Sequence, residues 1–125
     1  MIIGIGVDIV EPARIAGMIE RHGERFLQRT FTPGEIAYSS GRKRAVEHFA
    51  ARWAAKEAVA KALGTGISRR VHWKDIEVIK EGTGAPTVKL HGGVASIAGE
   101  LGVRHVHLSL SHIESLAVAM VIIEG

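Results

Sequence analysis

The chain opens with a short apolar run in which glycine recurs at every second position. Ile3, Ile5 and Val7 fall on one face of a strand over residues 2–7, because side chains alternate along an extended backbone. The other face carries two glycines and ends in Asp8. We therefore expect a buried strand whose glycine face lets another part of the chain approach closely.

Periodic apolar positions and helix-boundary signals predict five helices. Pro12 and Gly23 bound the first, and a short second helix covers residues 24–28. Thr32 and Glu35 form a capping box that starts a third helix, which ends near residues 39–41. The clearest prediction is an alanine-rich helix over residues 44–63, stopped by the glycine at position 64. A shorter helix over residues 93–101 is closed by the glycine at position 102.

Four β-rich segments predict two hairpins in the second half of the chain. Residues 76–80 and 87–90 flank a glycine-rich loop, and residues 106–111 and 116–123 flank a tight turn. A strand followed by helices and then by strands favours an α+β fold. We expect one domain over residues 1–125, with a mostly antiparallel sheet packed against the long central helix.

Composition and charge narrow the class of protein. Hydrophobic residues make up 46% of the 125 and charged residues 23%, and there is no cysteine, which excludes a disulfide framework and a thiolate zinc site. Nothing resembles a leader peptide or a membrane-spanning run, so we expect a cytoplasmic protein with no membrane partner. Residues 1–70 hold 12 Lys and Arg against seven Asp and Glu, so they should attract nucleic acid, a phosphorylated small molecule or an acidic protein.

Asp8 and the charged residues of the long predicted helix are the first candidates for chemistry. Asp8 either binds a ligand at the end of the glycine-lined strand or caps the helix that follows. Glu57 and Lys61 are four residues apart and share one helix face, as do Arg52 and Lys56. A solvated helix with weak ion pairs is the alternative interpretation. The many alanines around these charges leave room for a ligand or for a closely packed neighbour.

A glycine turn and a polar strand face are further candidates. Gly64 begins a Gly-Thr-Gly turn that would face a phosphate, although its place at a helix C-terminus favours an ordinary glycine cap. Hydroxyl and imidazole groups that suit phosphate oxygens line one face of the strand near residue 110. They are His105, His107, Ser109 and Ser111, followed by His112. A solvated sheet face and a His-x-His zinc pair remain alternatives.

Basic residues recur along the first predicted helix and beyond it. Arg14, Met18, Arg21 and Arg25 follow the spacing i, i+4, i+7 and i+11, so they would line one ridge if the helix continued past Gly23. Such a ridge is either a solvated face or a docking surface for an acidic, amphipathic helix.

Three segments taken together resemble a known family. They are IGVDIVE at residues 5–11, FAARWAAKEA at 49–58 with KALG at 61–64, and HLSLSH at 107–112. In this order and spacing they resemble the holo-[acyl-carrier-protein] synthases, the short, single-domain branch of the 4′-phosphopantetheinyl transferases. The segment TFTPGE at residues 30–35 also fits that family, and the resemblance covers essentially the whole chain. Trp53 is a mild departure, because phenylalanine is frequent at that position.

The resemblance implies a reaction and an assembly. The 4′-phosphopantetheine arm of coenzyme A is transferred to a serine of apo acyl carrier protein, which leaves adenosine 3′,5′-bisphosphate. The family is typically a homotrimer with active sites at subunit interfaces, and this implies the same here. Magnesium is the implied metal ion, and coenzyme A is the implied co-substrate.

The resemblance also implies a role for individual residues. Asp8 and Glu57 match the magnesium ligands, and Lys61 matches the lysine beside the transferred phosphate. Either Glu57 or a metal-bound water would take the serine proton, and the sequence leaves both open. The residues expected at coenzyme A are Asp8, Arg52, Lys61, Gly64, His107, Ser109, Ser111 and His112. Those expected at the acidic carrier protein are Arg14, Met18, Arg21 and Arg25.

Two other functions stay open at this point. A small nucleic-acid-binding module is favoured by the isoelectric point near 9.6 and by the basic run at residues 42–44. Aromatic residues are only 5% and no RNA-reading pattern is present, so we expect no nucleic-acid partner. A magnesium-dependent phosphohydrolase would use the same carboxylates with water as the acceptor, and the basic ridge would then have no role.

Overall fold

The computed structural model describes residues 1–125, and its elements follow the predicted order. The first half contains β1 (Ile2–Val10), α1 (Pro12–His22), α2 (Glu24–Thr30), α3 (Pro33–Ser40) and α4 (Ala45–Ala62). The second half contains the short 3-10 helix η1 (Trp73–Asp75), β2 (Ile76–Ile79), β3 (Thr87–Leu90), α5 (Gly92–Leu101), β4 (His105–His112) and β5 (Ala117–Glu124). The α+β class, the five helices and both hairpins are confirmed. No helix combines the length and hydropathy needed to cross a membrane.

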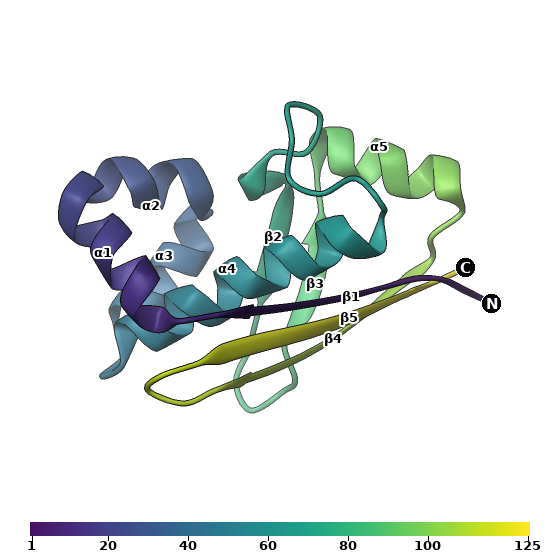
Figure 1. Cartoon of the computed structure of the whole chain (residues 1–125). Coiled ribbons are helices and arrows are strands. Elements are labelled where there is room, and N and C mark those ends of the chain that lie inside the picture. The colour runs from purple at the N-terminus through teal and green to yellow at the C-terminus, as the bar shows by residue number, and fades with distance from the viewer.

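The strands form two antiparallel sheets. The larger has the order β1-β5-β4 and the smaller pairs β2 with β3. Asp8 on β1 lies opposite Ala119 on β5, and Ala119 lies opposite Leu110 on β4. Figure 1 shows these three strands as one long layer along α4, with both chain termini at the same end. The terminal residues Met1 and Gly125 are joined by two backbone hydrogen bonds of 3.0 Å.

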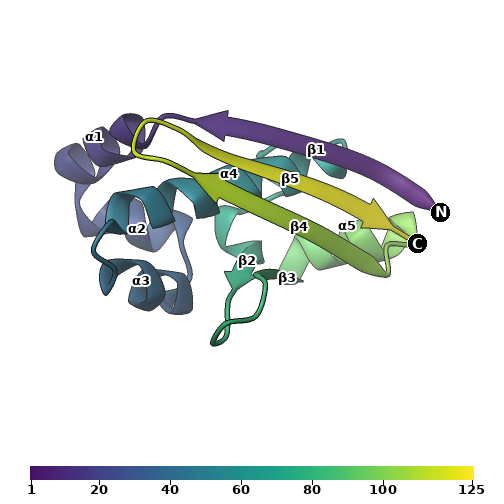
Figure 2. The same cartoon turned by 90° about the horizontal axis from the view of Figure 1, so that it is seen from below.

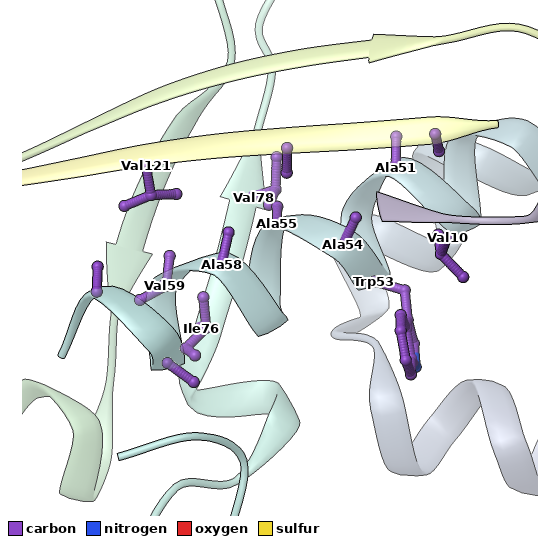
Figure 3. Packing of buried hydrophobic residues seen from close by; sticks show 14 of the residues in the cluster. Val10, Ala51, Trp53, Ala54, Ala55, Ala58, Val59, Ile76, Val78 and Val121 are labelled. Atoms are coloured by element: carbon purple, nitrogen blue, oxygen red, sulfur yellow. The ribbon is translucent and has the colours of Figure 1, made fainter. Parts of the chain in front are cut away.

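Small residues let α4 pack lengthwise on one face of the larger sheet. Figure 3 shows Ala55 and Ala58 between α4 and β5, where both are fully buried. On β1, a Cβ added to Gly6 would collide with the carbonyl oxygen of Ala58. Gly4 approaches the carbonyl oxygen of Ala62 in the same way. The predicted close approach at the glycine face is therefore confirmed, and its partner is the backbone of α4.

The opposite face of this sheet is uncovered, so the prediction of a buried first strand is wrong. Ile5 and Val7 are each 57% exposed, and Ile9 is 62% exposed. Met120 on β5, opposite Val7, is 46% exposed. In Figure 2 the three strands lie in front of the helices with nothing over that face. The alternation along β1 is as predicted, but the helix packs on the glycine side, since only there can its backbone come close.

A buried ion pair joins α3 and α4 to the start of the second sheet. Thr32 and Glu35 form the predicted capping box at the start of α3. The Glu35 carboxylate also pairs with Nζ of Lys56 at 2.8 Å, and both side chains are fully buried. The same ammonium donates to the carbonyl oxygens of Trp73, at 2.9 Å, and Ile76. All three ammonium protons therefore have acceptors within the chain.

Candidate active site

Asp8 lies near the end of β1, on the face that meets α4. Its Oδ1 pairs with Nζ of Lys61 at 2.9 Å, and the same ammonium donates to the carbonyl oxygen of Val7 at 3.1 Å. Its second oxygen, Oδ2, is buried without a hydrogen-bond partner. The N-cap of α1 is Glu11, so Asp8 is not the helix cap of the alternative interpretation. The carboxylate instead reaches across to the long helix.

Glu57 stands on α4 one turn before Lys61. Burial raises the pKa of Glu57, and the charge of Asp8 raises it further, whereas Lys61 and Arg14 lower it. A carboxylate whose pKa is raised by a neighbouring carboxylate lacks compensating positive charge, even with an ammonium group nearby. The structure thus brings together Asp8, Glu57 and Lys61, the residues expected to carry the chemistry.

The carboxylate pair fits a magnesium ion. This ion prefers oxygen ligands and is usually held by one or two carboxylates, with phosphate oxygens and water completing the shell. The unpartnered Oδ2 of Asp8 and the raised pKa of Glu57 both mark oxygens that a cation would stabilise. No group of three or more His, Cys, Asp or Glu side chains is arranged for a metal ion. The chain therefore offers two carboxylates rather than a complete cage.

Glu57 also lines a cleft of about 660 Å³ between α1, α2 and α4. Basic side chains from the two short helices line it, namely Arg14, His22, Arg25 and Arg29. Apolar side chains line it as well, namely Met18, Phe26, Trp53, Ile67 and Trp73. The cleft combines positive charge with apolar surface and ends beside a carboxylate of the candidate metal pair.

The residues expected to form a basic ridge along one continuous helix lie on two helices, and three of the four line this cleft, namely Arg14, Met18 and Arg25. The backbone at Gly23 has a φ of 54°, which ends α1 and allows α2 to start in a new direction. Arg25 on α2 therefore lines the same cleft as Arg14 and Met18 on α1. Arg21 is not among the lining residues, and its Nη2 donates to the sulfur of Met18 at 3.7 Å.

Arg52 and His112 meet in a second pocket, of about 150 Å³. Arg52 and Glu57 face different sides of α4, because five residues advance an α-helix by about 140° beyond a full turn. Tyr38, Lys80, His48 and Pro86 also line this pocket. It therefore collects basic side chains from α4, β4 and the β2–β3 loop.

The guanidinium of Arg52 packs against the ring of Tyr38 in this second pocket. Arg52 is buried, with its charge 4.2 Å from the ring centroid of Tyr38, and its Nε has no hydrogen-bond partner. Burial lowers the pKa of Arg52, and it also lowers that of His48, with the neighbouring His112 adding to the effect. His112 is anchored by Glu47, with 2.9 Å between Nδ1 and Oε1. Such a site favours an anion, which would supply the missing negative charge.

The polar row on β4 lies elsewhere in the chain. His107, Ser109 and Ser111 are exposed on the outer face of the larger sheet, as their alternation predicts. His107 pairs with Glu124 at 3.0 Å. Gly64 has a φ of 80° and ends α4, which is the ordinary role of a glycine cap. Within one chain, the residues expected at coenzyme A are therefore distributed over several separate places.

Comparisons with known proteins indicate the same family along nearly the whole chain. The sequence matches the profile of the 4′-phosphopantetheinyl transferase superfamily over residues 4–121. The chain belongs to this superfamily. It is 55% identical over 124 residues to the holo-[acyl-carrier-protein] synthase of Koribacter versatilis, covering 99% of each chain, and 49% identical to that of Solibacter usitatus, covering all of both.

Solved structures of this transferase superfamily show the same fold. The crystal structure of holo-[acyl-carrier-protein] synthase from Neisseria meningitidis matches with a TM-score of 0.91 and 36% identity over 100% of both chains. The Helicobacter pylori synthase, in complex with coenzyme A, matches with a TM-score of 0.85 and 31% identity, covering 96% of this chain and 99% of the other. The chain is accordingly a transferase by family and by fold.

Several residues of this transferase were missed by sequence reasoning. Arg29 and Trp73 line the cleft, and Tyr38, His48 and Lys80 line the second pocket. Arg29 follows Arg25 by four residues and His48 precedes Arg52 by four, so helical spacing could have found both. Trp73, Tyr38 and Lys80 carried no local signal, because their neighbours in the sites come from distant parts of the chain.

Proposed function

We propose that the chain, acting in the cytoplasm, transfers the 4′-phosphopantetheine arm of coenzyme A to a serine of apo acyl carrier protein. The serine oxygen bonds to the phosphorus that carries the arm, the bond to the bridging oxygen breaks, and adenosine 3′,5′-bisphosphate leaves. One observation carries the proposal. Glu57 lines a basic cleft and stands one helical turn from Lys61, which pairs with Asp8, in a chain of the 4′-phosphopantetheinyl transferase superfamily.

Each of these residues has a role that suits phosphoryl transfer, which depends mainly on alignment and charge neutralisation. The Lys61 side chain is 49% exposed, so its ammonium can meet phosphate oxygens while it stays near Asp8. Either Glu57 or a water on the metal ion that it would hold is assigned as the base for the serine proton. Asp8 and Glu57 would hold Mg²⁺, which would supply charge to the pyrophosphate oxygens.

The nucleotide part of coenzyme A is assigned to the second pocket. Arg52 offers an unpartnered guanidinium nitrogen there, and His112 adds an imidazole. By resemblance, His107, Ser109, Ser111 and Gly64 are assigned to the border of the bound nucleotide, although within one chain they lie outside the second pocket. The Helicobacter pylori relative was solved in complex with coenzyme A, which supports coenzyme A as the ligand class.

The carrier protein is assigned to the cleft, where Arg14, Met18 and Arg25 lie. A basic lining with apolar surface complements an acidic helix that also carries an apolar side chain. Arg21 stands beside Met18, outside the cleft lining, and would add to the positive field there.

The chain is also proposed to form a homotrimer with shared active sites. The uncovered face of β1 and β5 exposes Ile5, Val7, Ile9 and Met120, a contiguous apolar surface of the kind that interfaces bury. The second pocket and the Asp8–Glu57 pair lie on different sides of α4, so joining them into one site requires two copies. Light scattering should give three times 13.4 kDa. A fully active monomer would contradict the shared-site assembly.

A mass-spectrometric assay tests the reaction. The protein is mixed with apo-carrier protein, coenzyme A and Mg²⁺, and the carrier serine is examined for a phosphopantetheine adduct. We expect the adduct, its loss with a chelator, and its loss in Asp8→Asn while the circular dichroism spectrum stays that of the wild type. Hydrolysis of coenzyme A without an adduct would point to the phosphohydrolase instead. Salt-sensitive RNA binding without coenzyme A binding would point to the nucleic-acid module.

A further inference from the structure

The only two tryptophans of the chain stack on each other at the wall of the cleft. Trp53 comes from α4 and Trp73 from η1, and their rings are 5.1 Å apart at an angle of 27°. Trp53 is 9% exposed, and Figure 3 shows its ring pointing away from β5 and the sheet core. Both rings line the cleft that also contains Glu57. The stack is therefore part of the cleft wall rather than of the core between α4 and the sheet.

Arg14 lies against this stack. Its guanidinium carbon is 5.1 Å from the ring centroid of Trp53, within the range of a cation–π interaction. Arg14 is exposed and forms no salt bridge in the structure, so its charge stays available to an anionic partner. A long exposed side chain samples many rotamers, and contact with a fixed ring restricts that freedom before a partner arrives.

The backbone of Trp73 is held by a hydrogen bond from α4. Nζ of Lys56 donates to the Trp73 carbonyl oxygen at 2.9 Å, and this ammonium is itself held by Glu35 at 2.8 Å. The backbone of η1 is therefore tied to α4 through a fully buried ion pair. The ring that leaves this backbone can support Trp53 without needing a ligand to order it.

We propose that Trp73 is a positioning residue: by stacking on Trp53 it holds Arg14 in place and so raises the affinity of the cleft for an acidic carrier-protein helix. The proposal rests on the proposed function, which places that helix in the cleft. Trp73 acts through Trp53 and Arg14 in this scheme, so its effect belongs to carrier binding. Binding of coenzyme A in the second pocket should not depend on it.

The test is a steady-state series on the full chain, with apo-carrier protein and coenzyme A varied separately. Trp73→Leu removes the stack but keeps an apolar side chain and the carbonyl that Lys56 needs. We expect the KM for carrier protein to rise about 3- to 10-fold, the size of an aromatic pair or a cation–π contact. The KM for coenzyme A and the kcat should stay unchanged. Trp73→Phe should restore the carrier KM, and Leu101→Ala, which removes exposed apolar surface outside the cleft, should leave it unchanged.

Arg14→Ala separates the possible outcomes. If Trp73 acts through Arg14, the double variant Arg14→Ala/Trp73→Leu should be no weaker for carrier protein than Arg14→Ala alone. Additive losses would overturn the proposal, as would a Trp73→Leu variant that raises both KM values or lowers kcat. An unchanged carrier KM in Trp73→Leu, with a raised one in Arg14→Ala, would overturn the proposal and leave the docking cleft intact. Unchanged values in both variants would overturn the docking cleft as well.

Discussion

Lys56 and Lys61 stand five residues apart on α4, and each pairs with a carboxylate from another element. The Lys56 side chain is fully buried, and its three acceptors are the Glu35 carboxylate and two backbone carbonyls. The Lys61 side chain is 49% exposed, and its partner Asp8 keeps one buried oxygen without a hydrogen bond. One ion pair is complete within the chain, whereas the other has capacity left for a ligand.

This difference gives Lys56 a structural role and Lys61 a chemical role on the same helix. A buried and fully bonded pair has no reason to exchange partners, because any exchange would leave a charge uncompensated in the interior. A pair whose lysine is half-exposed and whose carboxylate keeps an unpartnered oxygen can accept a cation at the carboxylate and a phosphate at the lysine. Residues of one charge type in one helix thus take opposite roles according to how fully the fold satisfies them.

The largest effect on this comparison is expected from Lys56→Met. Removal of the ammonium leaves the Glu35 carboxylate buried without a counter-charge, which should lower the free energy of unfolding by about 3–5 kcal/mol. Urea unfolding followed by circular dichroism measures this loss. The double variant Lys56→Met/Glu35→Gln removes the stranded charge and should recover part of the stability. A single variant as stable as the wild type would show that the pair is not the structural one.

A smaller and mainly functional effect is expected from Lys61→Met. The Lys61 side chain is 49% exposed but that of Asp8 is 13% exposed, so the free energy of unfolding should fall by less than in Lys56→Met, where both side chains are fully buried. Transfer activity should fall on the order of 10²-fold, as when one preorganised charge is removed from a transition state. Lys61→Arg keeps the charge and serves as the control in the adduct assay. A variant that loses stability but keeps its turnover would reverse the roles assigned to the two lysines.

Sequence reasoning located the elements because their boundary signals are local. Thr32 and Glu35 indicated the start of α3, and Gly64 indicated the end of α4. The same reasoning could not distinguish Lys56 from Lys61, since their carboxylate partners lie 21 and 53 residues away. Glu35 was recognised as a capping residue, and no local pattern indicates that its carboxylate also reaches into α4.

The candidate site was predictable to the extent that family resemblance supplied the distant contacts. It paired Asp8 with Glu57 before any geometry was known. In the structure Asp8 pairs with Lys61, one helical turn after Glu57, and its charge raises the pKa of Glu57. It did not indicate that Gly23 bends the basic ridge into a cleft, because that depends on how α1 and α2 pack. On β1, the glycines predicted the face at which another part of the chain comes close, and the structure shows that this part is α4. The sequence did not indicate that the opposite, apolar face stays exposed within one chain.

The smallest effect, and the sharpest for the comparison, concerns Glu57. Its pKa is raised in the folded chain, so the folded state binds a proton more tightly than the unfolded state does, and at neutral pH the ionised carboxylate opposes folding. Glu57→Gln removes that opposition. At pH 7 the variant should be slightly more stable, by less than about 1 kcal/mol because solvent screens this partly exposed group. As the pH falls below the ordinary value of 4.5, the wild-type carboxyl is protonated in both states and the difference should vanish.

Thermal unfolding of both proteins at neutral pH and at about pH 4 measures this difference in stability. A variant that is clearly less stable at pH 7 would mean that Glu57, like Glu35, is held in a completed structural pair.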